Sequence, residues 1–183
     1  MLKWLLRLIA LLVLAGLGLF LWGRTLPEHH VAPVSARYAR PPAEIWELVA
    51  DPKRLPEWYP DISKVTRLPD RDGKPCWLEE TGDGPLTVVH SEVRPPQRLV
   101  TELVFGTDEK PDFSGRWIFE LVPDGAGTRL TLVEDGRIHN PLFRALAHAV
   151  FGYQSTSEAW LKALGRHFGE DVVPERGEVV LDG

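Results

Sequence analysis

Two ionisable residues, His90 and Glu134, stand in stretches where the alternate residues are apolar. Read as β-strands, these stretches place His90 on the same face as Val88 and Glu134 on the same face as Leu132. Burial of such groups costs several kcal/mol unless they are paired. They could pair directly, serve as an acid and a base, or share a ligand role. The alternative is that one or both lie at a solvated strand end.

The remaining residues that could bind a metal or act in catalysis do not form a recognisable motif. Cys76 is the single cysteine, so the chain has no internal disulfide and no Cys-ligated metal centre. His29 and His30 are adjacent and would face opposite sides of a strand, which makes a poor metal site. The sequence also lacks phosphate-loop, dinucleotide, serine-hydrolase and zinc-protease motifs. We therefore expect neither a metal site nor a bound cofactor.

Large aromatic and apolar residues are candidates to line an internal cavity. Alternation puts Trp117, Phe119 and Leu121 on one face of an expected strand. Trp46 and Trp58 belong to short helical stretches that could close the mouth of such a cavity or fill an ordinary core. The full candidate ligand-binding set is Trp46, Trp58, Tyr59, Val88, His90, Trp117, Phe119, Leu121, Leu132, Glu134, Ala149 and Tyr153.

The charge balance argues against nucleic acid as a partner. The 183 residues carry a formal net charge of −5, and the isoelectric point is about 5.7. No cluster of Lys and Arg appears, although a phosphate-binding protein normally has a basic face.

The elements that position these residues are mainly strands. β-Rich stretches alternate with turn signals such as Asp72-Gly73 and Pro95-Pro96, and their close spacing predicts an antiparallel meander. The expected strands are 31–39, 62–68, 75–80, 86–94, 98–106, 115–122 and 128–138.

Helices are expected on either side of the meander. Pro41 and Pro42 suit the first turn of a short helix, and a second short helix follows before residue 60. At the C-terminal end, apolar residues recur every three or four positions from Leu142 to Phe168, which predicts one amphipathic helix of about 28 residues. Gly152 weakens its middle and can mark a bend or close packing.

The N-terminal residues predict a membrane anchor. Residues 4–22 are apolar apart from Arg7, and Trp4 and Trp22 occupy the ends, where aromatic belts lie. A cleaved signal peptide is the main alternative, but bulky residues stand where small ones are needed for cleavage. A buried core helix is disfavoured because the segment is apolar all round.

Charge flanking the span predicts its orientation. Lys3 and Arg7 precede the apolar run and Arg24 follows it, so the N-terminus is expected in the cytoplasm. In a bacterium, the following domain would then be periplasmic or extracellular, held on the inner membrane. The expected division is an anchor at 1–23, a linker at 24–30, one domain at 31–170 and a charged, frayed tail at 171–183.

Three parts of the sequence together resemble the SRPBCC (START-like, helix-grip) superfamily. They are the stretch ARYARPPAEIWELVADPKRLPEWYPDISKV, the stretch FSGRWIFELVPDGAGTRLTLVEDGRI and the terminal helix. The similarity is greatest to its branch of polyketide cyclases, dehydrases and lipid-transport proteins, and it covers about Val31 to Phe168. The resemblance implies an α+β helix-grip fold, with a curved antiparallel sheet of about seven strands around a long C-terminal helix. It also implies binding of an apolar ligand, but no particular chemistry.

We therefore expect membrane-tethered, non-catalytic binding of a lipid or another hydrophobic small molecule. A cyclase or dehydratase that uses His90 and Glu134 is one alternative. A protein-interaction module of an envelope complex is the other, and a cavity filled by its own side chains would favour it.

Overall fold

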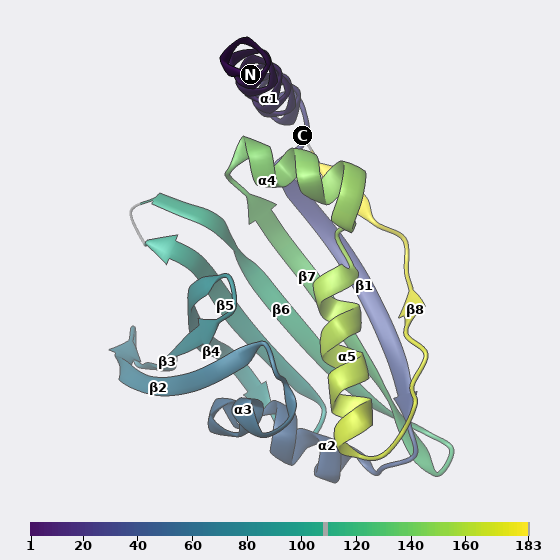
Figure 1. Ribbon diagram of the computed structural model, residues 1–183. Helices are drawn as coiled ribbons and strands as arrows, with labels where there is room; N and C mark the ends of the chain where they lie inside the picture. The colour runs from purple at the N-terminus through teal and green to yellow at the C-terminus, as the bar shows by residue number, and fades with distance from the viewer. Residues whose placement is uncertain (108–109, 183) are drawn as a thin grey trace.

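The computed structural model describes residues 1–107 and 110–182 and has the expected α+β helix-grip architecture. One antiparallel sheet curls around helix α5 (Ser155–His167), and helix α1 (Leu2–Gly23) projects from one end of the molecule (Figure 1). The core lies between the concave face of the sheet and α5.

Seven long strands form the body of the sheet, close to the predicted stretches. They are β1 (His29–Tyr38), β2 (Ile62–Arg71), β3 (Lys74–Thr81), β4 (Gly84–Arg94), β5 (Arg98–Thr107), β6 (Lys110–Asp124) and β7 (Gly127–Ile138). Their spatial order is β2-β3-β4-β5-β6-β7-β1. Strands β2 to β7 thus lie side by side in sequence order, and β1 lies beside β7.

The C-terminal segment is ordered, although a frayed tail was predicted. Strands β8 (Glu175–Arg176) and β9 (Val180–Asp182) pair with β1, which brings the described part of the sheet to nine strands. The side-chain amide of Gln154 also donates to the carbonyls of Pro33 and Gly177, at 2.8 Å each. The segment therefore covers backbone groups that β1 would otherwise expose at the sheet edge.

Short helices cover one end of the concave face. They are α2 (Pro42–Val49), η1 (Pro52–Arg54) and α3 (Leu55–Trp58). Proline opens α2 as predicted, and the Asp51 carboxylate accepts a hydrogen bond from the Lys53 amide to cap η1. In Figure 1 these helices lie at the opposite end of the molecule from α1.

Helix α5 fills the concave face. Trp160, Leu161 and Leu164 are each at most 3% exposed and belong to the main core cluster. The hydroxyl of Tyr38, from the end of β1, donates to the carbonyl of Leu161 at 2.8 Å and fixes the helix against the sheet. Burial of the Tyr38 phenol raises its pKa far above the ordinary range.

The prediction of one long C-terminal helix is wrong. Helix α4 (Pro141–Leu146) runs into a π-helical turn, η2 (Ala147–Phe151), and the chain then breaks at Gly152 before α5. Gly152 has φ +76° and ψ 157°, a conformation that only glycine adopts readily. Beyond the break, Ser157, Trp160 and Leu164 recur at helical spacing and are buried.

Helix α1 is long and apolar enough to cross a bilayer, and an N-terminal signal sequence would satisfy the same test. Its C-terminal end packs against α4. A Cβ on Gly23 would lie 1.8 Å from the Pro141 carbonyl oxygen, and the Trp22 and His148 rings meet edge to face at 5.7 Å. The strand β1 begins at His29, so two residues of the predicted linker belong to the sheet.

Replacement of Gly152 by alanine should destabilise the domain by about 1–3 kcal/mol, because a Cβ disfavours the observed φ and ψ. An added Cβ would meet nothing within 4 Å, so the cost is one of backbone conformation alone. Chemical denaturation of the detergent-solubilised chain measures the effect. Gly16→Ala, within α1 and equally free of contacts, should leave the midpoint unchanged. An unchanged midpoint for Gly152→Ala would contradict the prediction.

Candidate ligand-binding site

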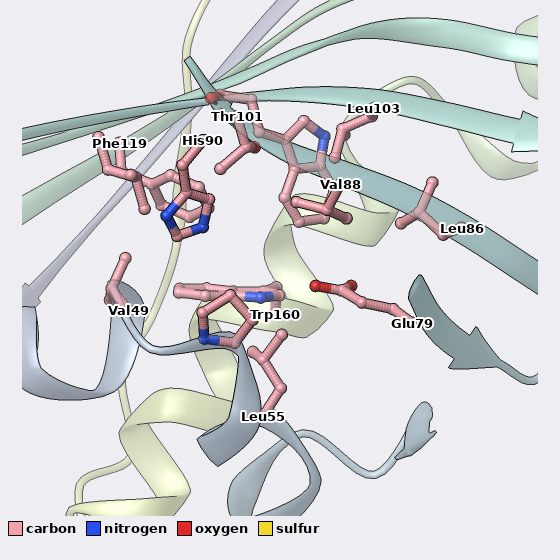
Figure 2. A pocket seen from close by; sticks show the side chains of 13 residues that line it. Val49, Leu55, Glu79, Leu86, Val88, His90, Thr101, Leu103, Phe119 and Trp160 are labelled. Atoms are coloured by element: carbon pink, nitrogen blue, oxygen red, sulfur yellow. Dashed lines mark hydrogen bonds between the residues drawn. The ribbon is translucent and has the colours of Figure 1, made fainter. Parts of the chain in front are cut away.

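A small buried pocket lies between the concave face of the sheet, the short helices and α5 (Figure 2). Its volume is about 40 Å³. Strands β3 to β6 form its floor, and Trp160 of α5 lies across it. The lining residues are Val49, Pro52, Leu55, Glu79, Leu86, Val88, His90, Leu99, Thr101, Leu103, Trp117, Phe119 and Trp160.

Two ionisable side chains, Glu79 and His90, point into this otherwise largely apolar pocket (Figure 2). Glu79 from β3 is 6% exposed and His90 from β4 is 7% exposed. A register shift follows His90 in β4, and such bulges re-aim neighbouring side chains. The His90 ring also packs on Trp77, with ring centroids 4.3 Å apart.

Burial moves the pKa values of these two groups in opposite directions. It raises the pKa of the Glu79 carboxyl from 4.5 to about 7, because the charged form loses its hydration. The pKa of the His90 imidazole falls from 6.5 to about 4, chiefly because of burial; the charge of Asp51 opposes this shift, and the charge of Arg67 adds to it. Between about pH 4 and 7 the pocket therefore holds a carboxylic acid and a neutral imidazole.

The structure brings together part of the predicted site. Val88, His90, Trp117 and Phe119 of the predicted set line the pocket. Four more predicted residues belong to the core cluster instead, namely Trp58, Tyr59, Leu121 and Leu132, and Trp46 packs against that cluster half-buried. Trp58 meets Trp160 edge to face at 4.8 Å, so it supports the wall of the pocket from behind.

His90 and Glu134 do not pair. Their strands place them in one row across the sheet, with Thr101 and Trp117 between them. Three strand spacings of about 4.8 Å separate them along the sheet, or roughly 14 Å. Glu134 instead accepts hydrogen bonds from the Trp117 indole, at 2.8 Å, and makes a 2.7 Å contact with His30 Nε2.

The remaining predicted residues lie outside the pocket. Tyr153 stacks on the His30 ring with centroids 4.8 Å apart and is half-buried. Ala149 is exposed on η2, because the break at Gly152 turns this segment away from the sheet. Ala149 therefore does not line the cavity, contrary to the prediction.

Three functional or structural side chains were missed in the sequence. Glu79 follows Trp77 by two residues, so the same alternation that places Trp77 inward could have revealed it. His30 was assigned to a solvated linker, yet it is 1% exposed and its Nδ1 atom has no hydrogen-bond partner. Arg144 is 3% exposed, and nothing in the local pattern marks it as buried.

The pocket is too small for a lipid in this conformation. A volume of 40 Å³ holds a few water molecules, because one water needs about 10–15 Å³ measured this way. Sites for small molecules are typically about 300–1,000 Å³. Among the residues described, no group of three His, Cys, Asp or Glu side chains is placed to hold a metal ion.

A curved sheet that grips a helix over a buried pocket defines the class of ligand-cavity helix-grip proteins. The family described as polyketide cyclase/dehydrase and lipid transport matches residues 29–169, which is most of the chain. The protein belongs to this family.

Solved structures share the fold at low sequence identity. A protein from Thermobifida fusca is 22% identical, with a TM-score of 0.56 over 76% of this chain and 93% of that one. The Mll3558 protein from Rhizobium loti is 21% identical, with a TM-score of 0.54 over 75% and 96%. CalU16 from Micromonospora echinospora is 22% identical, with a TM-score of 0.53 over 78% and 76%. No curated protein matches the chain.

The opposed pKa shifts predict a distinct pH dependence of stability. The raised pKa of Glu79 gives stability that is complete below pH 4.5 and lost as the pH rises through about 7. The lowered pKa of His90 gives stability that is complete above pH 6.5 and lost as the pH falls through about 4. Between pH 4.5 and 6.5 the two slopes cancel.

Glu79→Gln should therefore uncover the His90 slope, so that the free energy of unfolding rises with pH relative to wild type by up to about 1.4 kcal/mol per unit. His90→Phe should uncover the opposite slope. Denaturant titrations of the two variants and wild type across this range measure both differences. Parallel curves for wild type and Glu79→Gln would show that Glu79 keeps an ordinary pKa.

Proposed function

We propose that this protein binds a hydrophobic small molecule or lipid in the pocket at Glu79 and His90, while α1 tethers the domain to a membrane. The observation that carries the proposal is a buried apolar pocket with these two polar side chains aimed into it. Such a pocket favours a largely apolar ligand, and the polar groups fix its orientation. The family, whose description includes lipid transport, supports the same conclusion.

Ligand entry requires the pocket to open. Val49, Pro52 and Leu55 of the short helices contact the pocket, and α3 is a single helical turn. These helices and the Trp160 side chain are the parts whose displacement would enlarge the space without breaking the sheet. We expect the ligand to stabilise an open arrangement that is less populated without it.

A specific observation favours an enzymatic alternative. Glu79 and His90 line one cavity, and their environments push their pKa values apart, which is how acid and base roles are divided in active sites. In a cyclase or dehydratase, the protonated Glu79 would donate a proton and the neutral His90 would accept one. The candidate pair is therefore Glu79 with His90, in place of the predicted pair of His90 with Glu134. Glu134 is already engaged by His30 and Trp117.

Residues 1–23 are the proposed anchor and the rest of the chain is the proposed soluble part. Lys3 and Arg7, in the first turns of α1 and before the uncharged run 8–22, support a cytoplasmic N-terminus, and the domain would then lie outside, on a bacterial inner membrane. A tether of this kind keeps the pocket close to a bilayer, where an apolar ligand concentrates.

The ligand prediction is tested on a fragment that begins at Thr25, which retains all of β1. An apolar dye should bind this fragment and be displaced by lipids. Val88→Phe adds a ring inside the pocket and should abolish dye binding, with an overpacking cost of about 1–3 kcal/mol. Val93→Phe, at an exposed position of the same strand, is the matched control and should bind normally.

A folded fragment that never binds the dye would indicate a filled core and favour a protein-interaction module. Conversion of a bound substrate that is lost in Glu79→Gln and in His90→Phe would favour the enzyme.

The anchor prediction is tested in cells. The intact chain should fractionate with membranes and require detergent for release, and protease added outside spheroplasts should digest the domain. A mature N-terminus beyond Trp22 would show a cleaved signal instead. Protection of the domain, with a cytoplasmic control also protected, would reverse the orientation.

A further inference from the structure

An exposed apolar surface lies on α4 and η2. Phe143, Val150 and Phe151 expose 47%, 66% and 61% of their surfaces. Beyond α1, Phe143 and Phe151 are the exposed Phe or Trp residues in the part of the chain that the structure describes. Exposed apolar side chains gathered on one short segment typically mark a contact with another apolar phase.

This surface begins where α1 ends. Gly23 touches the backbone of Pro141, the first residue of α4, and Trp22 contacts His148 of η2. Figure 1 shows α4 lying across the base of α1. If α1 crosses a bilayer with Trp22 in the interfacial belt, α4 and η2 lie at the level of the lipid headgroups.

Arg144 fixes this arrangement. Arg144 is 3% exposed, and its guanidinium donates to the carbonyl of Leu26 at 2.9 Å and to the Glu28 carboxylate at 2.7 Å, both in the segment that follows α1. It also donates to the carbonyl of Ile138 at the end of β7. A single buried side chain thus ties the exit of the anchor, the sheet and α4 together.

The composition of the segment suits a membrane surface. Residues 139–153 contain no Asp or Glu, so nothing in the segment repels anionic headgroups. Helices that lie in the interface plane bury aromatic and aliphatic side chains at the boundary between headgroups and acyl chains.

We propose that α4 and η2 form a second membrane contact, in which Phe143, Val150 and Phe151 insert into the interfacial layer of the bilayer that α1 crosses. The inference rests on the proposed anchor. The domain is then held in one orientation on the membrane by two contacts, instead of hanging freely from a linker.

The full chain, reconstituted in vesicles of phosphatidylcholine and phosphatidylglycerol, tests the proposal. Val150→Cys carries an environment-sensitive fluorophore, and Cys76 is buried and does not compete for label. The matched control is Val122→Cys, at a position that is 58% exposed. Val122 lies opposite Arg129 on β7, which in turn lies opposite Arg37 on β1. Eight residues of β1 separate that position from His29 at the anchor end, or about 26 Å.

The label at Val150 should shift its emission to the blue and lose intensity to lipid-borne quenchers, whereas the Val122 label should be quenched by aqueous iodide. Co-flotation with vesicles separates the two hypotheses. A chain that does not float with vesicles refutes the anchor. A chain that floats while the Val150 label is open to iodide refutes the membrane contact alone. A Val150 label shielded from both quenchers would mean that a protein, such as a second copy, covers the surface, and this also overturns the proposal.

Discussion

The backbone conformation of Gly152 divides the C-terminal third of the chain into two parts with different tasks. A continuous helix of 28 residues would be about 42 Å long, whereas the ten residues of β1 span about 33 Å. The break leaves α5 with 13 residues, or about 20 Å, which lies within the length of the sheet and fills its concave face. The preceding turns are released from the core and lie against the end of α1.

Local sequence patterns predicted most of the strands and helices. They did not predict the helix break at Gly152 or the contacts between segments that are distant in sequence. Strand alternation and turn residues act over a few positions, so the seven long strands and the inward faces of Phe119 and Leu121 could be predicted. The helical stripe from Leu142 to Phe168 kept its period across Gly152, because periodicity carries no information about φ. The pairing of Glu134 with His30 depends on β1 lying beside β7, which no local pattern contains.

The structure contains two acid–imidazole sets, Glu134 with His30 and Glu79 with His90. They differ in whether the carboxyl group has polar partners inside the fold or faces a cavity. Glu134 accepts a hydrogen bond from Trp117 and meets His30, so both of its carboxyl oxygens have polar partners inside the fold. Burial instead dominates the environments of Glu79 and His90, which face a cavity. A fold that keeps polar groups aimed into an apolar space sacrifices stability there, and such sites are typical of ligand recognition.

These two sets are joined to helix α1 by continuous contacts. Trp22 meets His148, His148 meets Tyr153, and Tyr153 stacks on His30. His30 contacts Glu134, whose other oxygen accepts from Trp117, a wall of the pocket. Because Tyr153 follows Gly152 directly, the backbone break that frees α4 also positions the ring that links it to the sheet. One packed series of side chains therefore links α4 to a wall of the pocket.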